Sequence, residues 1–119
     1  KIIKNYYIFM GYVKFANYIV SKSSFEGDIA EDKKNEIIKK RLNKTFNNRL
    51  IIIDEVHNIR ISDDNKEKRV ATELLKLVNN VKNMRLLLLS ATPMYNSYKE
   101  IIWIINFCPN LRNSKWKIG

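Results

Sequence analysis

Two short apolar runs, each followed at once by polar side chains, constrain the fold of this chain more than any other feature. Residues 50–53 are Leu-Ile-Ile-Ile and precede Asp54 and Glu55, and residues 86–89 are four leucines that precede Ser90. Continuous runs of this length suit parallel strands that are covered on both faces. Because ligands bind at the carboxyl ends of parallel strands, we expect these polar groups to mark a functional site.

The segment between the two runs predicts a crossover helix over residues 63–82. Its apolar residues recur at helical spacing, and charged residues occupy the other faces. The apolar positions are Val70, Leu74, Leu77, Val78 and Val81. A strand–helix–strand unit is right-handed in nearly all cases and returns both strand ends to the same edge of the sheet. The side chains at 54–55 and 90–92 are therefore expected to be neighbours.

The amino-terminal half is expected to add one strand and two helices. Residues 4–10, rich in Tyr, Ile and Phe, predict a buried strand, and residues 13–20 predict a short helix. Residues 21–32 are polar and indicate a mobile loop. Residues 33–46 have apolar positions at helical spacing and predict a second helix, after which residues 47–49 turn into the first apolar run.

Composition favours one domain in a reducing, intracellular setting. The chain has 119 residues and is 45% hydrophobic, enough for one core. It has no apolar segment long enough to cross a membrane, no visible signal peptide, and a single cysteine, Cys108, outside any His/Cys cluster. The net charge of +10 suggests a nucleic-acid partner. AT-rich codons, which favour Ile, Asn and Lys, can account for part of that charge, and the basic residues are spread along the chain.

The polar clusters resemble the motifs of a known family. Asp54-Glu55-Val56-His57 resembles motif II, the Walker B or DExH box, of superfamily 2 helicases and translocases, and Ser90-Ala91-Thr92 resembles their motif III. The Thr-Pro-x-x-Asn turn at 92–96 and the Glu-Ile-x-Trp-x-x-Asn-Phe segment at 100–107 are similar to the Swi/Snf-like branch. Within it, the chain most resembles the transcription ATPases and helicases of poxviruses and other large DNA viruses, such as the early transcription factor ATPase subunit.

The resemblance covers residues 49–109, with a less specific match at 11–19, and implies an α/β, RecA-like P-loop NTPase lobe with a parallel sheet. The chain contains no Gly-x-x-x-x-Gly-Lys-Ser/Thr phosphate loop, or Walker A. We therefore expect residues 1–119 to be the carboxyl-terminal part of the first RecA-like lobe of a helicase, inactive alone. The implied cofactors are ATP and Mg²⁺. The implied partners are nucleic acid, DNA or RNA, and RNA polymerase or other transcription-complex subunits, in cytoplasm, virion or nucleus and not in a membrane.

The resemblance also implies a role for each motif residue. Asp54 would hold Mg²⁺ through water, and Glu55 would orient and deprotonate the attacking water. His57 would couple the ATP site to the second lobe or to motif III. Ser90 and Thr92 would supply hydroxyls that bond to motif II and change partners with the nucleotide state.

Simpler structural alternatives stand beside these roles. The acidic pair can be a solvated strand end, His57 a satisfied core or surface histidine, and Ser90 and Thr92 strand terminators. Tyr12, at the end of the first predicted strand, is assigned to core packing, and contact with a nucleic-acid strand in the full protein is the alternative. For the protein as a whole, two alternatives to an active enzyme stay open. One is a catalytically inactive structural or nucleic-acid-binding subunit of a transcription complex, and the other is a nucleic-acid-binding module whose DExH run is incidental.

Overall fold

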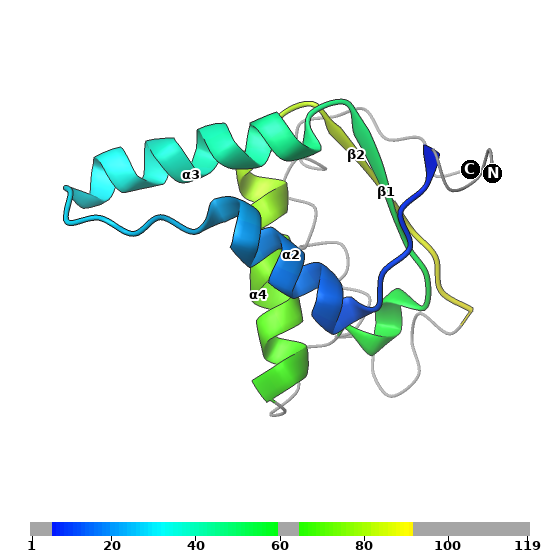
Figure 1. Ribbon diagram of the computed structural model, residues 1–119. Coiled ribbons are helices and arrows are strands. Elements are labelled where there is room, and N and C mark those ends of the chain that lie inside the picture. Colours follow the sequence, from blue (N-terminus) through cyan, green and yellow to red (C-terminus); the bar gives the residue numbers. More distant parts are fainter. Residues whose placement is uncertain (1–5, 60–64, 92–119) are drawn as a thin grey trace.

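The computed structural model describes residues 6–59 and 65–91, and in these ranges three α-helices lie on one face of a two-stranded parallel sheet (Figure 1). The predicted α/β class is confirmed at this level. None of the described helices has the length and apolar character needed to span a bilayer. In chain order the elements are α2 (Tyr12–Ser23), α3 (Glu31–Phe46), β1 (Arg49–Ile53), the 3-10 helix η1 (Val56–Asn58), α4 (Asn65–Asn80) and β2 (Met84–Leu88).

Strand β1, helix α4 and strand β2 form the predicted strand–helix–strand unit. The strands pair in parallel, with Arg49 opposite Met84 and Ile53 opposite Leu88. Both strands therefore end at the same edge of the sheet, as expected. The predicted first residues of the crossover helix, 63–64, lie outside the described residues.

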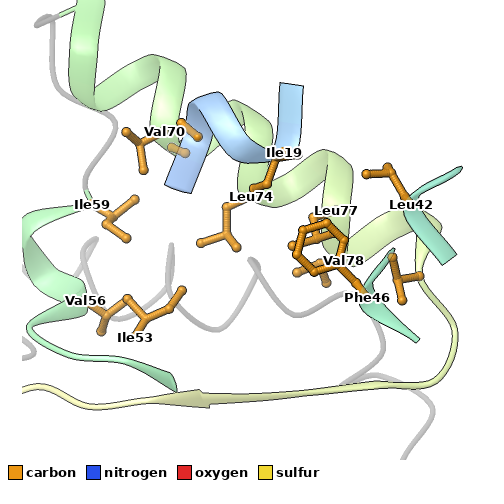
Figure 2. Packing of buried hydrophobic residues seen from close by; sticks show 13 residues of the cluster. Ile19, Leu42, Phe46, Ile53, Val56, Ile59, Val70, Leu74, Leu77 and Val78 are labelled. Atoms are coloured by element: carbon orange, nitrogen blue, oxygen red, sulfur yellow. The ribbon is translucent and has the colours of Figure 1, made fainter. Parts of the chain in front are cut away.

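The core fills the space between the helices and the helix-facing side of the sheet (Figure 2). Leu74 and Leu77 of α4 are fully buried, as are Ile19 of α2 and Leu42 of α3. All five apolar positions predicted for the crossover helix are buried. Burying an aliphatic side chain of this size contributes about 1.5–3 kcal/mol, so this helical face stabilises the unit that holds the two strand ends.

An asparagine connects the end of α3 to the end of α4. The side-chain amide of Asn43 donates to the carbonyls of Lys39 and Asn80, at 2.8 Å each, and its oxygen accepts the Lys82 N–H at 3.2 Å. The last carbonyls of a helix have no partner within the helix. Asn43 therefore satisfies one of these groups and guides the chain from α4 into β2.

The expectation that both faces of the strands are covered is wrong for the described part of the chain. Burial alternates along each strand. On the face away from the helices, Leu50, Ile52, Leu87 and Leu89 remain 43–58% exposed. Side chains of successive strand residues point to opposite faces, and α2, α3 and α4 all pack on the other one.

The buried strand predicted over residues 4–10 is also not found where the structure describes it. Residues 7–10 have no regular structure, and Tyr7, Ile8 and Phe9 are exposed. The rings of Tyr7 and Phe9 stack on each other at 6.3 Å. Aromatic and β-branched residues form a strand only where a neighbouring backbone pairs with them, and in the described sheet β1 pairs only with β2.

The loop predicted at residues 21–32 is confirmed only in its central part, residues 24–30. Helix α2 continues to Ser23, whose buried hydroxyl donates to the Ile19 carbonyl at 2.9 Å. Helix α3 begins at Glu31, which places two acidic residues in its first turn. Acidic side chains interact favourably with the positive end of the helix dipole, so the helix starts before the apolar pattern does.

Candidate functional site at the carboxyl ends of the strands

The site begins where the turn after β1 is hydrogen-bonded to the end of β2. The N–H of Leu89 donates to the Ile53 carbonyl at 2.9 Å, and the Val56 N–H donates to the Leu89 carbonyl at 3.0 Å. These bonds extend the parallel pairing beyond the strands themselves. The two polar clusters are therefore neighbours, as the strand–helix–strand pattern predicted.

Asp54 is the first residue of the turn, and its side chain is exposed. Its Oδ1 accepts the N–H of Glu55 at 2.9 Å. This bond orients the carboxylate at the strand end while leaving oxygen lone pairs that face solvent. Carboxylate oxygens and water are the ligands that Mg²⁺ prefers, so the exposed Asp54 side chain fits a water-mediated magnesium contact. Within residues 6–59 and 65–91, no group of three His, Cys, Asp or Glu side chains is arranged to hold a metal ion.

Glu55 has a left-handed backbone conformation, with φ 52° and ψ 46°. For a residue with a Cβ, such a conformation costs about 1–3 kcal/mol and persists only where surrounding contacts hold it. The Glu55 carbonyl accepts the Asn58 N–H at 2.9 Å, which closes the 3-10 turn η1. The left-handed residue thus turns the chain from the strand into η1 and presents a half-exposed carboxylate.

His57 connects the two clusters through both of its ring nitrogens. Nε2 lies 3.3 Å from Oε2 of Glu55, and Nδ1 lies 2.7 Å from Oγ of Ser90. A carboxylate only accepts hydrogen bonds, so the ring tautomer that suits Glu55 carries its proton on Nε2. In that tautomer Nδ1 is an acceptor and the Ser90 hydroxyl donates to it, whereas a doubly protonated ring donates from Nδ1 to the Ser90 oxygen. The side chain of His57 is only 15% exposed and that of Glu55 is 47% exposed, so the imidazole is largely shielded from water while the carboxylate remains accessible.

Tyr12 is a residue of the site that sequence reasoning missed, since it was assigned to core packing. Its ring does pack against the core, but its hydroxyl donates to the carbonyl of Asp54 and lies 3.1 Å from that of Glu55. Burial raises the pKa of Tyr12, a hydrogen bond with the Asn58 side chain lowers it, and the neighbouring carboxylates raise it. The phenol therefore stays neutral and keeps its donor. The only sequence feature that could have pointed to this contact is that Tyr12 directly follows a glycine at the start of a helix.

Thr92, the second hydroxyl of the predicted motif III, lies outside the described residues, as do the turn at 92–96 and the segment at 100–107. Ser90 is the hydroxyl that the structure brings to the acidic cluster. The site as described thus contains two carboxylates, an imidazole, a serine hydroxyl and a phenol. Such a set can position water, accept a proton and transmit a displacement of one strand end to the other.

Comparisons with known proteins agree with the motifs. The model of the SNF2-related domain family matches residues 5–116. The protein named Putative helicase 087L, from Invertebrate iridescent virus 3, is 39% identical over 62 residues, which cover 52% of this chain and 6% of that protein. Nucleoside triphosphatase I from Choristoneura fumiferana entomopoxvirus is 39% identical over 93 residues, covering 71% of this chain and 14% of that protein.

The chain thus spans 6–14% of the length of these two viral relatives. No solved structure shows a significant match. The predicted resemblance to Swi/Snf-like ATPases and helicases of large DNA viruses is confirmed by the family match and by both relatives. Because the matched region includes both strand-end motifs, the chain belongs to the SNF2-related domain family.

Proposed function

We propose that this chain contributes the acidic part of an ATP-hydrolysis site to a DNA-dependent helicase or translocase that acts in viral transcription, within a RecA-like lobe. One observation supports the proposal above all. Glu55, His57 and Ser90 form a continuous chain of polar contacts between the ends of two parallel strands, directly beside the exposed Asp54. A solvated strand end requires no such connection.

In the proposed mechanism the two carboxylates, Asp54 and Glu55, have different roles. Asp54, the more exposed, would hold Mg²⁺ through water, and the ion when bound would neutralise charge on the terminal phosphates. Glu55 orients the attacking water and accepts its proton as the oxygen approaches the γ-phosphorus in line. His57 holds one Glu55 oxygen through Nε2, which leaves the other oxygen available for the water.

His57 and Ser90 couple this chemistry to the rest of the protein. A shift of the β2 end moves the Ser90 hydroxyl, and the imidazole then turns or loses this hydrogen bond. Either change alters the contact between Nε2 and Glu55, so a nucleic-acid contact beyond β2 can change the rate of hydrolysis. Thr92 is proposed as a second hydroxyl in this coupling.

The remaining parts of the catalytic site, including the phosphate-binding loop, are proposed to come from the rest of the full-length protein. This chain contains no phosphate-binding loop sequence, so we propose that the 119 residues alone do not turn over ATP. DNA is the proposed nucleic-acid partner along which the enzyme moves, and RNA is the alternative. RNA polymerase or other transcription-complex subunits are proposed partners, inside the infected cell or the virion.

The proposal is tested by Glu55→Gln in the full-length protein. We expect ATP turnover to fall by about 10²–10⁴-fold, the usual contribution of a general base, while ATP binding is retained. Asp54→Ala should in addition weaken magnesium-dependent ATP binding. Glu36→Gln, on the exposed surface of α3, is the matched control and should leave turnover unchanged. Normal turnover in a folded Glu55→Gln protein would contradict the assignment of Glu55 as the base.

A further inference from the structure

Tyr12 joins two parts of the chain that are far apart in sequence. It is the first residue of α2, and its hydroxyl contacts the carbonyls of Asp54 and Glu55. These are main-chain groups, so the contact does not depend on the conformation of either acidic side chain. A half-buried tyrosine that served only as core filling would not need its hydroxyl at this position.

The two carbonyls belong to the two peptide planes on either side of the Glu55 α-carbon. The Asp54 carbonyl lies in the plane before Glu55, and the Glu55 carbonyl lies in the plane after it. The relative rotation of these planes is what φ and ψ of Glu55 describe, and both angles are in the left-handed region. One hydroxyl that contacts both planes therefore holds the backbone rotation from which the Glu55 side chain departs.

The other contacts of the turn each hold one plane. The Asp54 carboxylate accepts the Glu55 N–H of the first plane. The Val56 N–H and the Glu55 carbonyl, both of the second plane, bond to the Leu89 carbonyl and the Asn58 N–H. Among the described residues, Tyr12 is the side chain that contacts both. Without the Tyr12 hydroxyl, each peptide plane beside Glu55 would be held only by its own contacts. The rotation between the two planes would then be less restricted.

We propose that Tyr12 is a positioning residue that fixes the direction of the Glu55 carboxylate. The inference rests on the proposed ATP hydrolysis and adds a specific element to it: the start of α2 controls the geometry of the acidic turn. Tyr12 touches neither nucleotide nor water in this role. It acts through the backbone of Glu55, whose side chain must meet both His57 and the attacking water.

The role is tested by Tyr12→Phe in the full-length protein, because phenylalanine keeps the ring and its packing and removes only the hydroxyl. We expect kcat for ATP to fall about fivefold to tenfold, the effect of losing one or two hydrogen bonds. The KM for ATP should stay within about twofold and the melting temperature should be unchanged, since a positioning defect affects turnover more than nucleotide binding.

Two further variants separate positioning from packing. Tyr18→Phe removes a tyrosine hydroxyl from the same helix, where the ring packs edge-to-face on Phe46, and should keep wild-type kcat. Replacing Tyr12 with 3-fluorotyrosine keeps the hydroxyl donor and should restore turnover. If the fluorotyrosine protein is as impaired as Tyr12→Phe, or if the loss in Tyr12→Phe follows a lower melting temperature, the residue serves packing and the inference is wrong.

The result also distinguishes this inference from the proposed function. A wild-type protein that hydrolyses ATP, alongside a folded Tyr12→Phe protein with the same kcat, would overturn the role of Tyr12 alone. A full-length wild-type protein without ATP turnover would overturn the proposed function, and this inference with it.

Discussion

Removal of the Ser90 hydroxyl is expected to uncouple ATP turnover from nucleic acid. Ser90→Ala deletes the hydroxyl that is hydrogen-bonded to Nδ1 of His57, a partly buried contact of 2.7 Å. A hydrogen bond of this kind contributes about 0.5–1.5 kcal/mol net, which corresponds to a change of about twofold to tenfold in a rate or equilibrium constant. Alanine fits the same space at the end of β2, so we expect folding to be preserved.

The assay compares ATP turnover of the full-length protein with and without DNA. DNA-stimulated turnover should fall by the twofold to tenfold given by one lost hydrogen bond. Basal turnover should fall less than this, because without DNA no shift of the β2 end has to be transmitted through Ser90 and His57 to Glu55. Ser21→Ala is the matched control, since it deletes an exposed serine hydroxyl that bonds only its own helix, to the Tyr18 carbonyl. Full DNA stimulation in a normally melting Ser90→Ala protein would refute the coupling argument.

Three further predictions concern stability. Leu74→Ala should lower the free energy of opening of α4 by about 2–5 kcal/mol, because the side chain is fully buried, and unchanged hydrogen exchange of the α4 amides would contradict this. Asn43→Ala should lower stability by about 1–3 kcal/mol and expose the Lys82 amide, which then exchanges faster. Burial raises the pKa of Tyr12 above 10.0, so its neutral form stabilises the fold fully below pH 10.0 and progressively less as the pH rises through the folded-state pKa. The melting temperature of the wild type should therefore fall below that of Tyr12→Phe as the pH rises through that pKa, and melting temperatures that stay equal through this range would contradict the raised pKa.

Much of the fold follows from local patterns in the sequence. The two apolar runs predicted β1 and β2, and the helical spacing between them predicted the buried face of α4, because these features depend on consecutive residues only. The same pattern placed the acidic pair and Ser90 at one edge of the sheet. The strand predicted over residues 4–10 is wrong for its described part, since strand propensity cannot say whether a neighbouring backbone is available for pairing.

The exposure of the outward face of the sheet is a second feature that local sequence patterns did not predict. A continuous apolar run predicts two covered faces, yet Ile52 and Leu87 stay about half exposed. Which elements pack on a sheet is decided by the whole domain, and this chain spans 6–14% of the length of its two viral relatives. The RecA-like completion of the lobe and the roles of the individual site residues stay predictions.

By itself the sequence determined both strands, the three helices, the position of both motifs and the family, because periodicity and motif order are properties of neighbouring residues. Only the tertiary structure decided which groups meet. His57 and Ser90 are 33 residues apart, and Tyr12 lies 42 residues before Asp54. Hydrogen bonds require distances near 3 Å, so such partners are chosen by how α2, β1 and β2 pack together. The left-handed turn at Glu55 has the same origin, because contacts from other elements must offset a conformation that its own residue type disfavours.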